Sequence, residues 1–357
     1  MKRIVAIVLA LAMLFALAAC AAEVKDEPKT DDPAPQTDPE PTPEPEPTTD
    51  PATEPSTEPD PEPAPEPVNV RVASLKGPTT MGIVALRDKA EKGETFDSYT
   101  FDMQTDASAV AAQVVAGEAD IALVPANLAA VLYKRTEGGV AVIDINTLGV
   151  LYCVTGDESI TSVKDLAGKT VVLTGQGTTP EYSLRYLLEK NGVTDCELEF
   201  KSEATEVAAV LAADPTKIAV LPQPFATVAQ VQNTELHEAF SLSDEWDAVS
   251  DGSRMVTGVT IVRKAFLEEH PEAVARFLEE HAASAAAENA DKAALIVKYG
   301  IIEKEPVANK ALPKCGIVCI SGDEMKAALS GYLGVLYAAD PTSVGGALPA
   351  DDFYYVG

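Results

Sequence analysis

The chain has 357 residues, with 56 acidic against 27 basic side chains, and its formal net charge at pH 7 is −29. An acidic surface repels the phosphate backbone, which argues against a nucleic-acid partner. The five cysteines include no CxxC pair, and none of the three histidines lies at metal-ligand spacing from them, so we expect no metal and no cofactor.

The N-terminal segment, residues 1–20, is typical of a secretory signal peptide. Two basic residues precede an apolar run, which ends in small residues. The final Leu-Ala-Ala-Cys resembles the lipobox of bacterial lipoproteins, in which the cysteine receives lipid and becomes the first mature residue. The resemblance implies lipidation of Cys20 and an extracytoplasmic location at the cell membrane. An ordinary cleaved signal with a chance cysteine is the alternative.

Residues 21–67 form a segment of unusual composition, with 15 prolines and 15 acidic residues against two lysines. Such a segment holds too few apolar side chains to form a core, so we expect a disordered, extended tether. At roughly 3 Å per residue in a polyproline-like chain it would reach on the order of 100 Å. It would hold a globular part away from a membrane surface.

The remaining part, residues 68–357, is larger than one core usually organises, so two lobes are expected. Along this part, strand-like segments, in which apolar and polar residues alternate or which are short and wholly apolar, are followed by segments of helical periodicity. The expected strands are 68–74, 98–103, 120–124, 170–174, 196–200 and 217–221. The expected helices are 81–93, 108–119, 127–139, 180–192, 206–214 and 224–233. This rhythm predicts an α/β fold of parallel sheets with helices on both faces.

Three strand-to-helix junctions combine glycine or proline with a candidate capping side chain. They are LKGPTTMG (75–82), VPANLAA (124–130) and TGQGTTPEY (174–182). The candidate caps are Thr79 or Thr80, Asn127, and Thr178 or Thr179. Such junctions lie beyond the carboxyl ends of parallel strands, where helix N-termini attract polar or anionic groups. A purely structural role is the alternative for each, and Thr178 to Glu181 fits a self-satisfying capping box.

Several separate segments resemble the solute-binding proteins of ABC importers in the nitrate, sulfonate, taurine and thiamine-precursor group. They include GTTPEYSLRYLLEKNGV, IAVLPQPFATVAQ and VTGVTIVRKAFLEEHPEAVARFLEEHAAS. The resemblance implies a type II periplasmic-binding fold, in which two crossover strands near 148–155 and 255–262 serve as a hinge. Lobe one would be 68–149 plus 256–357, and lobe two 150–255. LKGPTTMG and SVGGALPADDFYY resemble a sub-branch whose ligand is not identified.

The resemblance also implies which residues line the cleft. From lobe one these are Lys76, Gly77, Pro78, Thr79, Thr80, Met81 and Asn127. From the hinge and lobe two they are Gly149, Leu151, Tyr152, Gly177, Thr178, Thr179, Pro222, Gln223 and Pro224. Gln223 departs from the more usual family pattern and would offer a neutral amide, so the solute's identity does not carry over. Lys76 is the cation nearest the threonine turns in sequence, and we expect a polar, zwitterionic or singly charged solute.

Enzymatic motifs are absent from the sequence: there is no G-x-S-x-G, no H-E-x-x-H and no P-loop. We therefore expect no catalysis. His270 and His281 are expected at the surface, and Trp246 in a lid or anchoring a loop. Phe225 is expected in the core rather than against a flat ligand. The four cysteines after the signal are expected to be buried thiols: Cys153, Cys196, Cys315 and Cys319.

We therefore expect a lipid-anchored, monomeric solute-binding protein outside the cytoplasm. It would capture a small molecule between two lobes and deliver it to an ABC permease and its ATPase, with closure driven by contacts made only in the closed state. Two alternatives stay open from the sequence. One is a sensor that presents its closed form to a membrane receptor or kinase, and the other is a surface adhesin.

Overall fold

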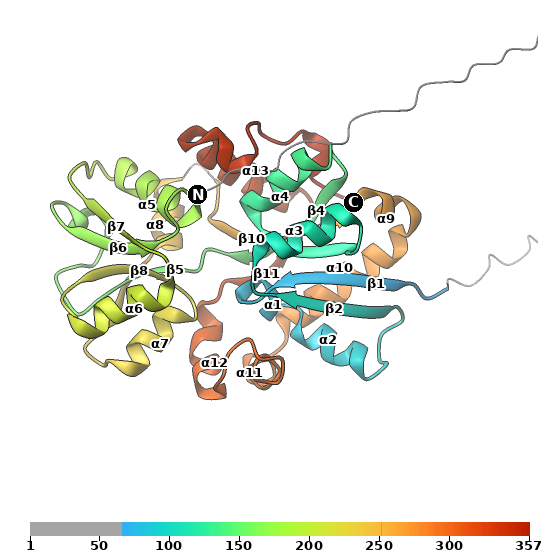
Figure 1. Cartoon of the computed structure of the whole chain (residues 1–357), viewed down its shortest axis with the longest axis horizontal. Coiled ribbons are helices and arrows are strands. Elements are labelled where there is room, and N and C mark those ends of the chain that lie inside the picture. The colour runs from blue at the N-terminus through green and yellow to red at the C-terminus, as the bar shows by residue number, and fades with distance from the viewer. Residues whose placement is uncertain (1–65, 251) are drawn as a thin grey trace, which may run out of the picture. The chain divides into compact units, whose positions relative to one another are not determined.

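The computed structural model describes residues 66–250 and 252–357 (Figure 1). The expected signal segment with Cys20 and nearly all of the expected tether lie outside the described residues. Within the described part, no helix combines the length and the apolar character needed to cross a membrane.

Sheet one has six strands in the order β11-β4-β10-β3-β1-β2 (Figure 1). They are β1 (Asn69–Leu75), β2 (Ser98–Gln104), β3 (Ile121–Pro125), β4 (Val140–Leu148), β10 (Val256–Arg263) and β11 (Ile317–Ile320). Strand β1 pairs in parallel with β2 and β3, whereas β10 is antiparallel to β3 and β4, and β11 is antiparallel to β4.

Sheet two has five strands in the order β7-β6-β8-β5-β9. They are β5 (Leu151–Thr155), β6 (Thr170–Thr174), β7 (Glu197–Lys201), β8 (Ile218–Pro222) and β9 (His237–Ser241). Strand β6 is parallel to β7 and β8, and β5 is antiparallel to β8 and β9. Both sheets are therefore mixed, with antiparallel strands beside the expected parallel ones. The reason is that β5 and β10 enter their sheets from the other one, at the edge where the parallel strands end.

Helices cover both faces of each sheet. Around sheet one lie α1 (Pro78–Met81), α2 (Val84–Glu91), α3 (Ala107–Ala116), α4 (Ala126–Arg135), α9 (Lys264–Glu269), α10 (Pro271–Ala286), α11 (Asn289–Lys298), α12 (Glu305–Ala311), α13 (Gly322–Ala339) and the short turns η2 (Leu312–Lys314), η3 (Pro341–Val344) and η4 (Asp351–Phe353). Around sheet two lie η1 (Val163–Leu166), α5 (Thr179–Lys190), α6 (Ala204–Ala213), α7 (Phe225–Gln232) and α8 (Leu242–Val249).

The chain passes between the sheets twice, at residues 149–150 between β4 and β5 and again between α8 and β10. These passages coincide with the boundaries expected from the sequence, at 149/150 and 255/256. The division into two lobes with these limits is kept as a prediction. Every strand before the first passage, together with β10 and β11, belongs to sheet one.

Helix α13 contributes to the cores of both sheets. Its Tyr332 is fully buried, and the ring centroid lies 5.5 Å from that of Trp246 in α8. Trp246 in turn lies 4.3 Å from the ring of Tyr186 in α5. Trp246 is therefore not a lid residue, because its indole is buried within this aromatic group. The alternative of a loop anchor is confirmed, since the indole N–H donates to the Ser253 hydroxyl, in the loop between α8 and β10, at 3.1 Å. The apolar side chains of α13 hold sheet one and the helices of sheet two in one continuous hydrophobic cluster.

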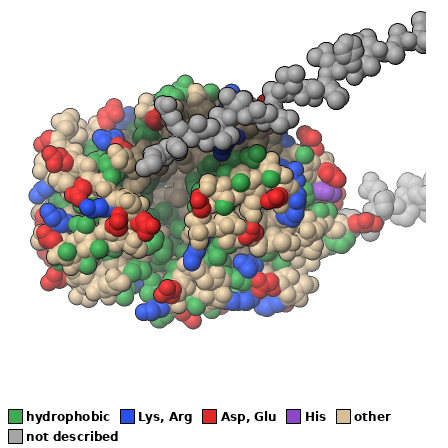
Figure 2. Space-filling model, in the orientation of Figure 1, with side chains coloured by type: hydrophobic (Ala, Val, Ile, Leu, Met, Phe, Trp, Pro, Cys, Tyr) green, Lys and Arg blue, Asp and Glu red, His purple; other side chains and the backbone are tan. Residues whose placement is uncertain are grey.

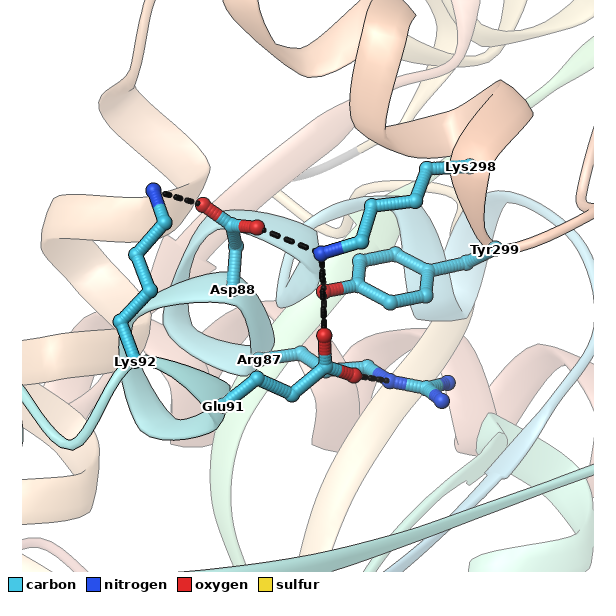
Figure 3. A network of polar contacts seen from close by, with 6 residues as sticks. All are labelled: Arg87, Asp88, Glu91, Lys92, Lys298 and Tyr299. Carbon is cyan, nitrogen blue, oxygen red and sulfur yellow. Dashed lines mark hydrogen bonds and ion pairs between the residues drawn. The ribbon is translucent and has the colours of Figure 1, made fainter.

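Helix α11 is fixed to α2 by a network of polar contacts at the surface of sheet one's helical layer (Figure 3). The Lys298 ammonium donates to Asp88 at 2.7 Å and to Glu91 at 2.9 Å. The Arg87 guanidinium lies 4.1 Å from the centroid of the Tyr299 ring. These groups are largely solvated, so each contact adds little stability, but together they define the position of α11.

The structure corrects the expectation that His281 lies at the surface. Its imidazole is fully buried where α10 meets sheet one, and its Nδ1 lies 3.1 Å from an oxygen of Asp144 in β4. Burial works against the charged imidazolium, but the Asp144 carboxylate outweighs it and raises the pKa of His281 to about 10. The polar side of α10 thus faces the Asp144 carboxylate within the core. Helical periodicity shows that this side of the helix is polar, but it does not show whether solvent or a buried polar group lies opposite.

The thiols divide into two kinds. Cys153 and Cys315 are fully buried, as expected, but Cys196 and Cys319 are only partly buried. Burial raises the pKa of Cys315 to about 12 and that of Cys196 to about 11. Cys315 precedes strand β11, and Cys319 lies in it.

Three strands of sheet one are tied together by Asp120, which is 3% exposed. Its carboxylate accepts from the Arg71 side chain at 2.8 Å and 2.5 Å and from Arg263 at 2.6 Å. Burial disfavours the charged carboxylate, but the two guanidiniums outweigh it and lower the pKa of Asp120. Arg71 lies in β1, Arg263 is the last residue of β10, and Asp120 directly precedes β3. The cluster therefore fixes the register of these three strands at the end of sheet one where β3 begins.

We expect Asp120→Asn to lower the free energy of unfolding at pH 7 by about 1–3 kcal/mol, since both guanidiniums lose a charged partner but keep some solvent contact. The measurement is urea unfolding, with Asp102→Asn as the control because Asp102 is exposed. Since the pKa of Asp120 is lowered by folding, its contribution is present above the unfolded value of about 3.9 and lost as pH falls below it. A difference that grew on acidification would contradict this assignment.

Candidate functional site

A cavity of about 230 Å³ lies where the two sheets meet, and residues from both sides line it. The lining residues are Leu148, Gly149, Tyr152, Ser241, Ser243, Asp244, Asp247, Arg254, Met255, Pro313, Lys314 and Gly316. The cavity is bounded by the end of β4, the start of β5, the end of β9 and the segments before β10 and β11. We call it the junction cavity.

The position of this cavity follows from strand direction. Tyr152 in β5 pairs with Leu221 of β8 and with Ser241 of β9, so the start of β5 lies at the edge where β8 and β9 end. The carboxyl ends of parallel strands are the usual place for ligands in open α/β sheets. Figure 2 shows the face of the molecule hollowed between the part that holds sheet two and the part that holds sheet one.

The lining of the junction cavity carries charges of both signs. Asp244 and Asp247 come from α8, Arg254 from the segment before β10, and Lys314 from η2. Arg254 makes no ion pair with any carboxylate among the described residues. Burial raises the pKa of Asp247 above its ordinary value, although the nearby Arg254 opposes this shift. The arrangement suits a small solute that carries both an anionic and a cationic or donor group.

Two glycines and a serine form the narrow wall of the junction cavity. A Cβ on Gly149 would lie 1.9 Å from Ser243 Oγ, and one on Gly316 would lie 3.0 Å from the Gly149 carbonyl oxygen. Gly316 also has a φ of 58°. The hydroxyl oxygen of Ser243 is buried without a hydrogen-bond partner in the part of the chain that the structure describes. Any side chain at position 149 would therefore force the first passage away from α8.

An ion pair closes one side of the junction cavity by joining the two sheets. The Lys314 ammonium contacts the Glu238 carboxylate of β9, and Glu238 is 13% exposed. Gln223 and Gln230 each donate a side-chain N–H to the same carboxylate at 2.9 Å. The Tyr152 hydroxyl donates to the backbone carbonyl of Lys314 at 3.1 Å. We call this group the Glu238–Lys314 bridge.

Tyr152 reaches this bridge from within the cavity wall. Burial, reinforced by the Glu238 charge, raises the pKa of Tyr152 to about 12. The phenol therefore keeps its proton at physiological pH and acts as a hydrogen-bond donor. Of the residues predicted from the sequence, Gly149 and Tyr152 line the junction cavity.

The first threonine turn lies apart from the cavity. The Thr79 and Thr80 hydroxyls donate to the Leu75 carbonyl at 2.8 Å and 2.6 Å, and the two residues are 5% and 3% exposed. Gly77, not a threonine, occupies the N-cap of α1. The expectation of capping hydroxyls was therefore wrong, because each hydroxyl points back to the end of β1. Met81 is buried in the core and Lys76 is exposed.

The second threonine turn is exposed to solvent and also lies outside the junction cavity. Thr178 is the N-cap of α5, but its hydroxyl donates to Gly175 O at 2.7 Å rather than accepting from the helix. The backbone N–H of Gly177 instead donates to Glu181 at 2.7 Å. The expected capping box is thus wrong in both halves, because Glu181 accepts from the residue before the N-cap and the Thr178 N–H donates to Gly175 O. A solute-binding role of Gly177, Thr178 and Thr179 stays a prediction.

The remaining predicted residues make internal contacts. Asn127 follows the N-cap residue Pro125 and donates to Ser343 O at 3.4 Å, so it is not a cap. Gln223 is 1% exposed, and its amide oxygen accepts from the Thr227 hydroxyl at 2.8 Å. The expectation that Gln223 offers a free amide to the solute was therefore wrong. Its neighbours Pro222 and Pro224 flank it at the end of β8, and Leu151 is buried in the core.

Sequence reasoning missed most of the polar lining. No ligand motif marks Asp244 and Asp247 in α8, Arg254 in the loop before β10, or Lys314 at the end of η2. One available signal was proximity, because Arg254 directly precedes Met255, the expected start of the second crossover. The place of Lys314 could not be predicted in this way, because it reaches the cavity only when η2 packs against β9.

Larger hollows occur elsewhere on the described surface, and the two largest are compared with the junction cavity. One of about 710 Å³ lies between α5 and α13, with Tyr182 and Arg185 among its lining residues. Another of about 400 Å³ is lined by the end of α10 and the start of α11, where Lys292 is buried. The first is a groove between two helices and carries charges of both signs, but it lies away from the carboxyl ends of the strands. The second also reaches the start of β11 and shares Pro313 and Gly316 with the junction cavity. The junction cavity is smaller, and it lies where the ends of β4 and β9 meet the start of β5.

Comparison with known proteins gives the family and the fold. The family model described as "NMT1/THI5 like" matches residues 98–293. No curated protein matches the sequence significantly.

Solved structures with the same fold include an ABC transporter protein from Parabacteroides distasonis, which is 22% identical with a TM-score of 0.67 over 80% of this chain and 98% of that one. The periplasmic aliphatic sulphonate-binding protein SsuA from Escherichia coli is 13% identical, with a TM-score of 0.61 over 81% and 96% of the two chains. The periplasmic nitrate-binding protein NrtA from Synechocystis PCC 6803 is 11% identical, with a TM-score of 0.51 over 73% and 75%. The predicted type II periplasmic-binding fold is thereby confirmed.

We expect Lys314→Met to weaken the contact between the sheets, because Glu238 would then keep only amide partners for a largely buried charge. A part-buried ion pair of this kind contributes about 1–2 kcal/mol. Amide hydrogen exchange should accelerate by roughly 5-fold to 30-fold in η2 and β9. Lys310→Met is the matched control, because Lys310 lies on the same segment and is exposed. Equal amide exchange rates in the two variants would show that the bridge does not stabilise the contact between the sheets.

Proposed function

The chain belongs to the NMT1/THI5-like family, and we propose that it is the solute-binding component of an ABC importer, with its solute held in the junction cavity. The observation that carries the proposal is a cavity lined from both sheets, with acidic groups on α8 and basic groups on the segments before β10 and β11. This lining is typical of a binding site rather than of an enzyme's active site, because it offers no nucleophile with a paired base.

The solved structures with this fold support an import role, since the printed descriptions of the first two name an ABC transporter and a periplasmic sulphonate-binding protein. The cavity volume of about 230 Å³ is below the range of about 300–1,000 Å³ that drug-sized ligands occupy. We therefore propose a small, polar solute with charges of both signs. Its anionic group would face Arg254 and its cationic or donor group would face Asp244 and Asp247.

Capture would proceed by closure of the two sheets around the solute. The solute's contacts with both sides exist together only when the sheets are close, so binding favours the closed arrangement. The Glu238–Lys314 bridge and the Tyr152 hydrogen bond would form in the same arrangement and add to it. An ABC permease would then bind the closed form and receive the solute as the bridge opens.

We further propose that the protein acts outside the cytoplasm, attached to the membrane through lipid on Cys20. The support is the signal-like segment at residues 1–20, its lipobox-like end, and the proline-rich composition of residues 21–67. A tether of that length would let the globular part move between the bulk solution and the permease.

The test of the proposed function begins with the solute itself. Mass spectrometry of the purified chain should identify a small co-purified molecule, and calorimetry should then give its affinity. We expect Arg254→Gln to weaken binding by roughly 10-fold to 150-fold, because a hydrogen bond to a charged group contributes about 1.5–3 kcal/mol.

Arg185→Gln is the matched control for this substitution. Arg185 lies in the groove between α5 and α13, and its side chain is 56% exposed. The affinity of this variant should equal that of the parent. If Arg185→Gln lost affinity while Arg254→Gln kept it, the solute would bind in the helical groove and the assignment of the junction cavity would be wrong.

A further inference from the structure

Three side chains with metal-binding atoms converge beneath sheet one, in a place that the proposed solute site does not use. They are Asp144 of β4, His281 of α10 and Cys319 of β11, and their ligand atoms all lie within 4.8 Å of one another. Asp144 and His281 are fully buried, and Cys319 is partly buried. The three residues are far apart in sequence, so spacing motifs do not detect them.

The contacts within this cluster meet at one atom. Nδ1 of His281 lies 3.1 Å from a carboxylate oxygen of Asp144 and 3.9 Å from the sulfur of Cys319. In a catalytic triad the acid and the nucleophile lie on opposite ring nitrogens, and here they share one. Nε2 of His281 is buried without a hydrogen-bond partner among the described residues. The arrangement therefore does not suit nucleophile activation, but it does suit three ligands around a common centre.

We infer that Asp144, His281 and Cys319 form a binding site for a zinc-like divalent cation. In tetrahedral zinc sites the metal lies about 2.0–2.3 Å from nitrogen, oxygen and sulfur ligands, which places those ligand atoms roughly 3.3–3.6 Å apart. The two separations at Nδ1 lie within about half an ångström of this range. A mixed set of one oxygen, one nitrogen and one sulfur ligand favours zinc over magnesium or calcium.

Charge balance is compatible with the same assignment. A divalent cation would displace the protons of the imidazole and of the thiol, and the carboxylate and the thiolate would then neutralise its two positive charges. Without a cation, these polar groups share a single imidazole nitrogen in the interior, where unpaired polar groups are costly. With one, each ligand atom faces a positive centre, and the fourth position would be left for water or another small ligand.

Hydrogen bonds from neighbouring strands hold the Asp144 carboxylate in place. The Thr260 hydroxyl donates to the other oxygen of Asp144 at 2.8 Å, and Asn146 donates to Thr260 at 3.2 Å. Partners of this kind orient ligating carboxylates in metal sites. Strands β4 and β10 thus orient Asp144 before any cation binds.

The cation would secure a weakly held strand. Strand β11 lies at the edge of sheet one and pairs with β4 at Ile317 and Ile320, with a register shift between them. Coordination by Cys319 would join β11 to α10 and β4. The same segment carries Lys314 and Gly316 to the junction cavity, so the cation would also fix one wall of that cavity.

The test uses the full chain, stripped with EDTA and then titrated with Zn²⁺ or Co²⁺. We expect one bound ion per chain by elemental analysis, and a thiolate-to-cobalt charge-transfer band in the Co²⁺ form. Cys319→Ser should abolish this band and weaken zinc binding by at least about tenfold, since even second-shell changes cost 10-fold to 100-fold. Cys196→Ser is the matched control, because its thiol is partly buried on the other sheet, and it should retain both properties.

A readout besides metal content comes from stability. Zinc should raise the melting temperature of the parent and of Cys196→Ser, but not that of Cys319→Ser. Asp144→Asn provides a second variant, and it should keep the charge-transfer band with weaker affinity. The inference is overturned if the unaltered chain binds no stoichiometric ion, or if Cys319→Ser binds zinc as tightly as the parent. Either result would leave a buried His281–Asp144 pair beside an unused thiol.

Discussion

The two sheets are joined by only a few residues of backbone at the first passage, so side chains must decide how the sheets face each other. Gly149 is the narrowest point of that connection, because Ser243 lies where a Cβ would be. On one side the Glu238–Lys314 bridge spans the gap, and on another the aromatic contact of Tyr332 with Trp246 does. The backbone connection between the sheets is short, and side-chain contacts hold the sheets together. The position of the junction cavity and the proposed mode of capture both depend on this arrangement.

The two kinds of contact have different physical consequences. Burial of Tyr332 and Trp246 removes large apolar surfaces from water and resists separation at any salt concentration. The Glu238–Lys314 bridge is directional, partly solvated and weaker. Motion of the sheets is therefore expected to hinge near α13 and to open at the bridge. The side of the molecule that opens then lies next to the charged lining of the cavity. A solute bound there would gain contacts on closure and lose them on opening.

The sequence was sufficient to predict most of the strands and helices between β1 and α7, because their periodicity is local, although β4 was not among the expected strands. It was also sufficient, through the resemblance, to predict the type II fold. Gly149 and Tyr152, which the resemblance implied for the cleft, line the junction cavity, and their binding of a solute stays a prediction. It was not sufficient for the charged lining. Lys314 reaches the cavity through a turn that follows α12, and no local pattern indicates where that turn lies in space.

Local patterns also misled at specific residues. His281 lies on a polar helical side, which normally indicates solvent, but here it faces Asp144 within the core. Thr79 and Thr80 have the composition of helix caps, and their hydroxyls instead hold the end of β1. The partner of His281 comes from a strand far away in the sequence. The partner of Thr79 and Thr80 is the nearby Leu75 carbonyl, which takes the hydroxyls that would otherwise cap the helix. Which hydrogen-bond partner a polar side chain takes is decided by tertiary packing, and the local sequence does not encode that packing.

A crystal structure of the purified protein with its co-purified solute would test most directly whether the junction cavity is the binding site. We expect electron density for the solute in the junction cavity, within hydrogen-bond distance of Arg254, with the Glu238–Lys314 bridge formed. Density in the groove between α5 and α13, or at the two threonine turns with the junction cavity empty, would contradict this assignment.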